Sequence, residues 1–192
     1  MWTGISPSMR HLFIDLGHSI RFPGAKGVMA EIEWNRSIWA KLRPLIDQQK
    51  WLIREVPTDY GVLDLTANRQ LINRIKWINR NCVDGDVLLS IHGNSALNPS
   101  VRGVTTCYMG GSEYARVQAI KLSNAYSKAT GVPVWNGGAF DDRTARFGQI
   151  GMVRETRPFA LLIEAGFVSN KLDMAVKPEL AAQGIANYFN QL

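Results

Sequence analysis

The chain has 192 residues, 46% of them hydrophobic and 20% charged, a length that supports one sizeable core and is short for two. The 22 Lys and Arg residues against 16 Asp and Glu give a net charge of +6, so the surface should attract anionic polymers in general. The basic residues are scattered rather than gathered into one run with aromatic residues, which argues against a nucleic-acid-binding protein, and no segment has the composition of a linker.

The first half of the chain alternates apolar runs with amphipathic stretches. The apolar runs predict buried strands at residues 11–15, 51–56 and 86–92. The amphipathic stretches predict helices at residues 31–46 and 70–81, and Pro44 should kink or end the first of them. The inward faces of these helices carry Trp34, Ile38, Leu42 and Leu45, then Leu71, Ile75 and Ile78.

The second half continues the alternation. Strands are predicted at residues 101–109, 132–136 and 159–167, a helix at 112–129, and a Gly-containing loop at 137–149. A closing helix has Leu180, Ile185 and Phe189 inward. Strands that alternate with helices indicate an α/β fold, and nearly continuous apolar strands indicate a sheet covered on both faces. We therefore expect one domain over residues 1–192, with a twisted, mostly parallel or mixed sheet of about six strands between helices.

Cysteine usage and hydropathy exclude several classes of protein. Cys82 and Cys107 lie in no CxxC pattern, which excludes a zinc ribbon and favours two core thiols. No apolar run approaches the roughly 20 residues of a membrane-spanning helix, so we expect no stable membrane insertion. The start, MWTGISPSMR, lacks the apolar core of a secretory signal, which predicts synthesis in the cytoplasm.

Two of the three histidines share a structural position. His11 opens the first predicted strand, whereas His18 follows its end and His92 closes the strand at 86–92. Because ligands collect beyond the carboxyl ends of the strands in open α/β sheets, we expect His18 and His92 to be neighbours despite their separation in sequence. Either residue alone is more typical of a hydrogen-bonded loop histidine, but the pair favours metal ligation.

A carboxylate is the expected third ligand, because catalytic zinc sites commonly use two imidazoles, one carboxylate and an open water position. Glu31 and Glu33 compete for this role. At about 100° per residue, Glu31 lies in line with the apolar face of its helix, whereas Glu33 points roughly 160° away. An inward carboxylate needs a partner, and zinc would be that partner. The alternative, a carboxylate satisfied by the helix dipole, fits Glu33 better than Glu31.

A fourth candidate lies inside the last apolar strand. Glu164 interrupts the run FALLIEAGF, where a glutamate is rare without a paired or functional role. Strand alternation places it on the same face as Gly166, which would let a substrate or backbone come close. A buried salt bridge with Arg154 or Arg157 is the structural alternative.

These four residues together make a scheme for hydrolysis. Zinc lowers the pKa of bound water toward about 7 and polarises a carbonyl. Glu164 would act as general base toward the water and then as general acid toward the departing amine, a role favoured by a pKa raised in an apolar site. Amide or ester hydrolysis is the expected reaction class.

Six segments give the chain a resemblance to a known family. They are FIDLGHSIRFPGAKG, EIEWN, LINRIKWIN, DVLLSIHGNS, RGVTTCYMGG and RETRPFALLIEAGFVSNKLD. In this order, from Phe13 to Asp173, they resemble the zinc-dependent N-acetylmuramoyl-L-alanine amidases of the type-3 catalytic domain. Each segment alone is a weak signal, and together they are strong. The resemblance implies a fold similar to the zinc exopeptidases, of the phosphorylase/hydrolase-like kind.

The resemblance also implies site residues and a substrate. The zinc ligands would be His18, Glu31 and His92, with Glu164 as catalytic acid and base. Asn94 matches a position near the cleft and would be a substrate-binding candidate, although we expect it to shape a loop before it contacts substrate. The substrate would be the bond between the lactyl group of muramic acid and L-alanine in peptidoglycan. The sequence departs from the family at residues 19–22, where a second glycine or a small acidic loop is usual, so the rim of the cleft should differ.

The family serves either bacterial wall remodelling or phage-driven lysis. The missing signal sequence resembles the lytic phage enzymes, which implies a protein made in the host cytoplasm and released to the periplasm or wall. We expect a monomeric catalytic domain over residues 1–192 without a separate wall-binding module. The alternatives are a zinc carboxypeptidase or other metallopeptidase that uses the same ligands, a catalytically silent wall-binding protein, and an assembly component with an embedded amidase domain.

Overall fold

The computed structural model describes residues 9–57, 66–145 and 148–192, and within them six strands form one sheet in the order β2-β1-β3-β6-β4-β5. The strands are β1 (Arg10–Asp15), β2 (Trp51–Glu55), β3 (Val87–Asn94), β4 (Val104–Tyr108), β5 (Val134–Asp141) and β6 (Phe159–Phe167). Neighbouring strands pair in parallel except β4 and β6, which are antiparallel. The predicted mixed, mostly parallel α/β sheet is therefore confirmed.

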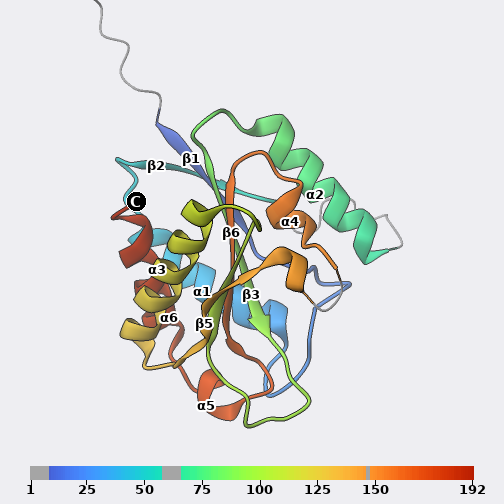
Figure 1. Ribbon diagram of the computed structural model, residues 1–192, viewed down its shortest axis with the longest axis vertical. Coiled ribbons are helices and arrows are strands. Elements are labelled where there is room, and N and C mark those ends of the chain that lie inside the picture. Colours follow the sequence, from blue (N-terminus) through green and yellow to red (C-terminus); the bar gives the residue numbers. More distant parts are fainter. Residues whose placement is uncertain (1–8, 58–65, 146–147) are drawn as a thin grey trace, which may run out of the picture.

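Helices cover both faces of this sheet (Figure 1). They are α1 (Glu31–Leu42), α2 (Ala67–Asn81), α3 (Glu113–Thr130), α4 (Gly151–Arg154), α5 (Lys171–Met174) and α6 (Pro178–Phe189), with 3₁₀ turns at Arg43–Leu45 and Asp142–Thr144. On one face, α6 contacts both α1 and α3, and α2 and α4 lie on the other face. No helix of the described ranges is long and apolar enough to cross a membrane.

Each strand of the sheet centre contributes to two cores. In β1, Leu12 and Ile14 join the larger core with Ile38 of α1, whereas Phe13 between them joins the smaller core with Ile78 of α2. All five side chains are fully buried. Alternate side chains of a strand point to opposite faces, so a strand buried on both faces needs an unbroken apolar run. Burial on both faces therefore explains why the strand segments of the sequence are almost continuously apolar.

The ends of the predicted helices depend on caps and on proline. The helix α1 ends at Leu42, and Pro44 lies in the 3₁₀ turn that follows, as expected for a residue without an N–H. The helix α2 begins three residues earlier than the periodicity suggested, because the side chain of Thr66 accepts a hydrogen bond from the backbone N–H of Arg69.

Two side chains predicted to face inward are exposed instead. Leu45 is 36% exposed because the 3₁₀ turn ends the helical periodicity that placed it on the inner face. Leu180 is 43% exposed. At 100° per residue it lies about 140° from the fully buried Ile185 around the axis of α6, so the prediction for Leu180 was wrong while those for Ile185 and Phe189 were correct. Of the two predicted core thiols, Cys107 is buried and Cys82 half-buried.

The strand β5 is longer than the sequence suggested. Residues 137–141, predicted as the start of a loop, belong to the strand, which bulges: its pairing with β4 passes from Val104↔Val134 to Thr106↔Ala139. Asn136 and the two glycines after it have positive φ angles, which form the bulge. The glycines that indicated a loop therefore belong to a kink inside a strand. Residues 146–147 of the predicted loop lie outside the described ranges.

A buried ion pair joins α2 to the sheet beneath it. Arg74 of α2 donates to the Asp15 carboxylate at 2.6 Å, and the Ser90 hydroxyl donates to the other oxygen at 2.6 Å. The Asp15 side chain is fully buried. Burial alone would raise the pKa of Asp15, but the Arg74 guanidinium and the Ser90 hydrogen bond hold it below its ordinary value of 3.8. The pair fixes the end of β1, which leads directly into the site.

We expect Arg74→Met to lower the free energy of unfolding by about 3–5 kcal/mol, because it leaves the buried Asp15 carboxylate without its cation. Urea unfolding at neutral pH measures this loss. It should shrink as the pH falls below 3.8, the ordinary pKa of Asp15, since protonation removes the charge that Arg74 stabilises. The matched control is Arg143→Met, which removes the mostly exposed partner of Asp141 and should cost much less. Equal losses in the two variants would contradict the structural role of Arg74.

Candidate functional site

Three parallel strands carry the candidate residues to one edge of the sheet. The strands β1, β3 and β6 are adjacent and parallel, so their carboxyl ends lie together. His18 follows β1, and His92 lies near the end of β3, directly opposite Glu164 of β6 in the register. The rings of His18 and His92 are 5.0 Å apart between centroids. The structure therefore brings together the two histidines that share this position, while His11 lies elsewhere and contacts Asp86.

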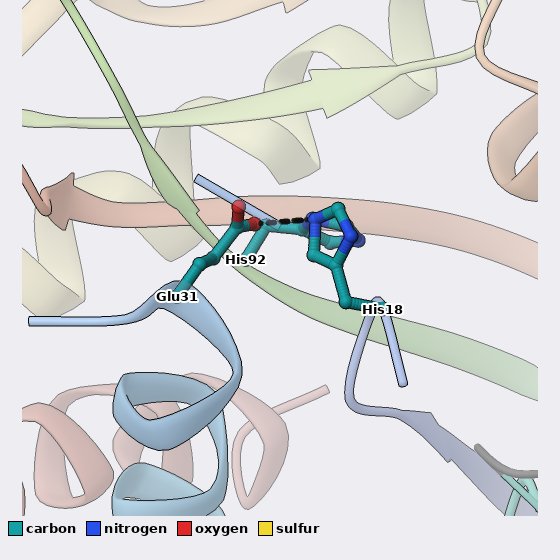
Figure 2. Close-up of side chains that lie close together, drawn as sticks. All are labelled: His18, Glu31 and His92. Atoms are coloured by element: carbon teal, nitrogen blue, oxygen red, sulfur yellow. Dashed lines mark hydrogen bonds and ion pairs between the residues drawn. The ribbon is translucent and has the colours of Figure 1, made fainter. Parts of the chain in front are cut away.

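Glu31 reaches the two histidines from the first turn of α1 (Figure 2). Its Oε1 lies 3.0 Å from His18 Nε2 and 2.8 Å from His92 Nδ1. The side chain is only 6% exposed, and backbone N–H groups of Ala25 and Gly93 donate to its two oxygens. Glu33, the competing carboxylate, is exposed to solvent. Of the two glutamates, Glu31 therefore lies beside the histidines, and Glu33 lies on the outer face of α1.

The loop after β1 adopts an uncommon backbone to present His18. Gly17 and His18 have φ angles of +59° and +41°, and a positive φ is uncommon for any residue with a Cβ atom. The N–H of Gly17 donates to Asp15 at 3.2 Å, which ties this turn to the end of the strand. A Cβ atom on Gly17 would lie 2.6 Å from the His92 ring, so glycine is required for the close approach as well. Such strain concentrates at functional sites.

The two imidazoles stabilise the charge of the carboxylate between them. Burial alone would raise the pKa of Glu31, but hydrogen bonds with His18 and His92 lower it well below the ordinary value. Conversely, burial would lower the pKa of His92, and the hydrogen bond and charge of Glu31 raise it. The three side chains offer two ring nitrogens and one carboxylate oxygen, all within 4.8 Å of one another. This donor set and spacing could hold a divalent metal ion.

Glu164 lies beside this cluster in a different electrostatic state. The side chain is half-buried, and its Oε2 is buried without a hydrogen-bond partner among the described residues. Burial and, to a lesser degree, the charge of Glu31 raise the pKa of Glu164 to about 7, although the nearby His92 opposes the shift. The arginines that the sequence offered as partners pair elsewhere, Arg154 with Asp142 and Arg157 near Asp84.

Asn94 shapes the loop after β3. Its side-chain oxygen accepts from the N–H of Ser95 at 2.8 Å, and its backbone carbonyl accepts from the N–H of Val168 at 2.8 Å.

Asp15 is a residue of the site that the sequence analysis missed. It supports the turn before His18 and, through Ser90, the strand that carries His92. The signal was present, since Asp15 ends the apolar run HLFID just as Glu164 interrupts FALLIEAGF. A buried acid in an apolar strand needs a partner or a function in either place.

Solved structures with the same fold include two N-acetylmuramoyl-L-alanine amidases and the catalytic domain of an endolysin. The catalytic domain of CwlV, an N-acetylmuramoyl-L-alanine amidase from Bacillus (Paenibacillus) polymyxa var. colistinus, is 25% identical over 95% of this chain and 97% of its own, with a TM-score of 0.72. An N-acetylmuramoyl-L-alanine amidase from Clostridium difficile 630 is 22% identical over 94% of each chain (TM-score 0.75). The catalytic domain of the CD27L endolysin, which targets Clostridia difficile, is 23% identical over 94% of each chain (TM-score 0.69).

The comparison with family profiles identifies the chain directly. No curated protein sequence matches it. The profile described as N-acetylmuramoyl-L-alanine amidase matches residues 12–187, which include every strand except the start of β1 and all the candidate residues. The match favours amidase chemistry over the metallopeptidase and silent-binder alternatives. The chain belongs to the N-acetylmuramoyl-L-alanine amidase family.

Proposed function

We propose that the chain hydrolyses the amide bond between N-acetylmuramic acid and L-alanine in peptidoglycan with a zinc ion held by His18, Glu31 and His92, and with Glu164 as the residue that moves the proton. The observation that carries this proposal is the contrast between two adjacent carboxylates. The pKa of Glu31 is lowered, so this carboxylate stays ionised among the potential metal donors. The pKa of Glu164 is raised to about 7, and one of its oxygens has no hydrogen-bond partner in the described chain. One ligand and one proton carrier are what metal-assisted hydrolysis requires.

Zinc, when bound, supplies a Lewis acid that polarises the scissile carbonyl and lowers the pKa of water. The chain's own contribution is to keep the donor atoms in place. The N–H groups of Ala25 and Gly93 fix the Glu31 carboxylate, and the turn at Gly17 fixes His18. All of these groups come from one chain, which supports activity as a monomer.

Glu164 carries the proton between the two halves of the reaction. As a carboxylate it removes a proton from the attacking water, and the protonated acid then donates this proton to the amine nitrogen of L-alanine as the C–N bond breaks. A pKa of about 7 suits both steps, because the ionised and the protonated forms are both well populated at neutral pH. Burial raises this pKa, while the residue as a whole is not fully buried and keeps part of its surface open.

The reaction is tested by its products. Incubation with purified peptidoglycan should release intact stem peptides with a free amino-terminal L-alanine, identified by mass spectrometry. A zinc chelator should abolish the release, and added zinc should restore it. Release of D-alanine or of new reducing sugar ends in place of stem peptides would overturn the proposed substrate bond, and chelator-resistant release would overturn the role of the metal.

The metal ligand is tested by a matched pair of substitutions in α1. Glu31→Gln keeps the shape of the side chain and removes its charge, so zinc binding should weaken by at least about 100-fold, the upper range for loss of an outer hydrogen-bond partner to a ligand. Glu33→Gln removes an exposed charge from the same turn and should leave zinc binding unchanged. Zinc content after dialysis and isothermal titration measure the difference. Equal affinities in the two variants would exclude Glu31 as a ligand.

The proton carrier is tested by Glu164→Gln, which keeps the size of the side chain and removes its acid–base function. We expect kcat to fall by about 10²-fold to 10⁴-fold, the usual contribution of a general acid or base. Zinc content should be unaffected, since Glu164 lies outside the donor group. A variant that bound zinc and kept the wild-type kcat would contradict this role.

A further inference from the structure

The strand on the far side of Glu164 carries a polar residue with no role in the scheme above. Thr105 of β4 is the register partner of Glu164 across the antiparallel pair of β4 and β6. Side chains directly opposite in such a pair lie on the same face, with Cβ atoms about 4.5–5.5 Å apart. His92, Glu164 and Thr105 therefore form one row across three neighbouring strands.

Thr105 and Glu164 each contain a buried oxygen that lacks a partner. Thr105 Oγ1 and Glu164 Oε2 are both buried and without a hydrogen bond among residues 9–57, 66–145 and 148–192. Buried polar groups are nearly always hydrogen-bonded, so two unpaired oxygens on opposite residues are unusual. They are also complementary, because a hydroxyl can donate to a carboxylate. A hydrogen bond between the two groups would satisfy both oxygens.

Thr105 and Glu164 differ in burial, and this difference limits the role that each can have. Thr105 is fully buried, whereas Glu164 is half-buried, so substrate can reach Glu164 but not Thr105. The bulge in β5 lies at the same level: its register with β4 passes from Val134 to Ala139 and skips the partner of Thr105. Bulges next to active sites commonly redirect a side chain of the sheet. Within the paired strands, the register partner of Thr105 is therefore Glu164 of β6.

We propose that Thr105 is a positioning residue that donates a hydrogen bond to the ionised Glu164 carboxylate and holds it in the orientation that removes the proton from water. The inference rests on the proposed role of Glu164. A carboxylate that is already held by a fixed donor has less conformational freedom to lose in the transition state. The hydrogen bond should therefore raise kcat and leave substrate binding unchanged.

The test compares three substitutions on one strand. Thr105→Val keeps the branched shape and removes the hydroxyl, and we expect kcat to fall by about 10-fold to 100-fold with KM and zinc content unchanged. Thr105→Ser restores the hydroxyl and should recover most of the lost rate. The matched control is Thr106→Val. Thr106 is equally buried but faces the other side of the sheet, where its hydroxyl bonds with Ser123 at 2.8 Å, so this variant should lose stability and keep kcat.

The outcomes distinguish this inference from the proposed function. If Glu164→Gln is inactive while Thr105→Val has the wild-type kcat, the role of Thr105 is wrong and that of Glu164 stands. Equal losses of kcat in Thr105→Val and Thr106→Val would also overturn the inference, because they would indicate a general disturbance of β4. If Glu164→Gln is fully active, the proposed function itself fails, whatever Thr105→Val does.

Discussion

The parallel pairing of β1, β3 and β6 is the constraint on which the site depends. Parallel neighbours end at the same edge of a sheet, so residues far apart in the sequence meet there without any loop having to reach across the molecule. The register is specified by burial on both faces, since a slip of one residue would turn every side chain of a strand to the opposite face. In β6 such a slip would move Glu164 away from His92 and place an apolar neighbour in the row instead. The cores around Leu12 and Phe13 therefore determine the geometry of the site.

Three carboxylates gather at this edge, and their partners account for their different properties. Asp15 is neutralised by Arg74 and accepts further hydrogen bonds from Ser90 and Gly17, which is the pattern of a structural ion pair. Glu31 is held by two N–H groups and two imidazoles, which leaves a compact set of metal donors. Glu164 has a buried oxygen with no partner in the described chain, and its pKa rises accordingly. Desolvation raises the pKa of all three carboxyl groups, and the donors around each one determine whether its final pKa lies above or below the ordinary value.

Much of this arrangement could be predicted from the sequence, because strands buried on both faces and strand-end histidines leave clear patterns. The span of β6 was predicted in full, and the inward face of α1 distinguished Glu31 from Glu33. The features that could not be predicted depend on pairing between distant strands. The bulge of β5 exists only against β4, and the glycines that form it are equally typical of a loop. Thr105 had no signal at all, because its position opposite Glu164 arises from the one antiparallel pair in a sheet that is otherwise parallel.

The site is also where the fold departs from its most stable arrangement. The positive φ of His18 and the unpaired oxygens of Glu164 and Thr105 are each unfavourable by amounts on the order of 1–3 kcal/mol. The apolar burial in the cores on both faces of the sheet offsets such costs. A carboxylate paired with a cation, such as Asp15 one strand away from His92, has a lowered pKa and is less suited to exchange a proton near neutral pH. The raised pKa of Glu164 is thus the property that suits it to the proposed role of proton carrier, and the cores packed on both faces of β6 hold the strand that carries it.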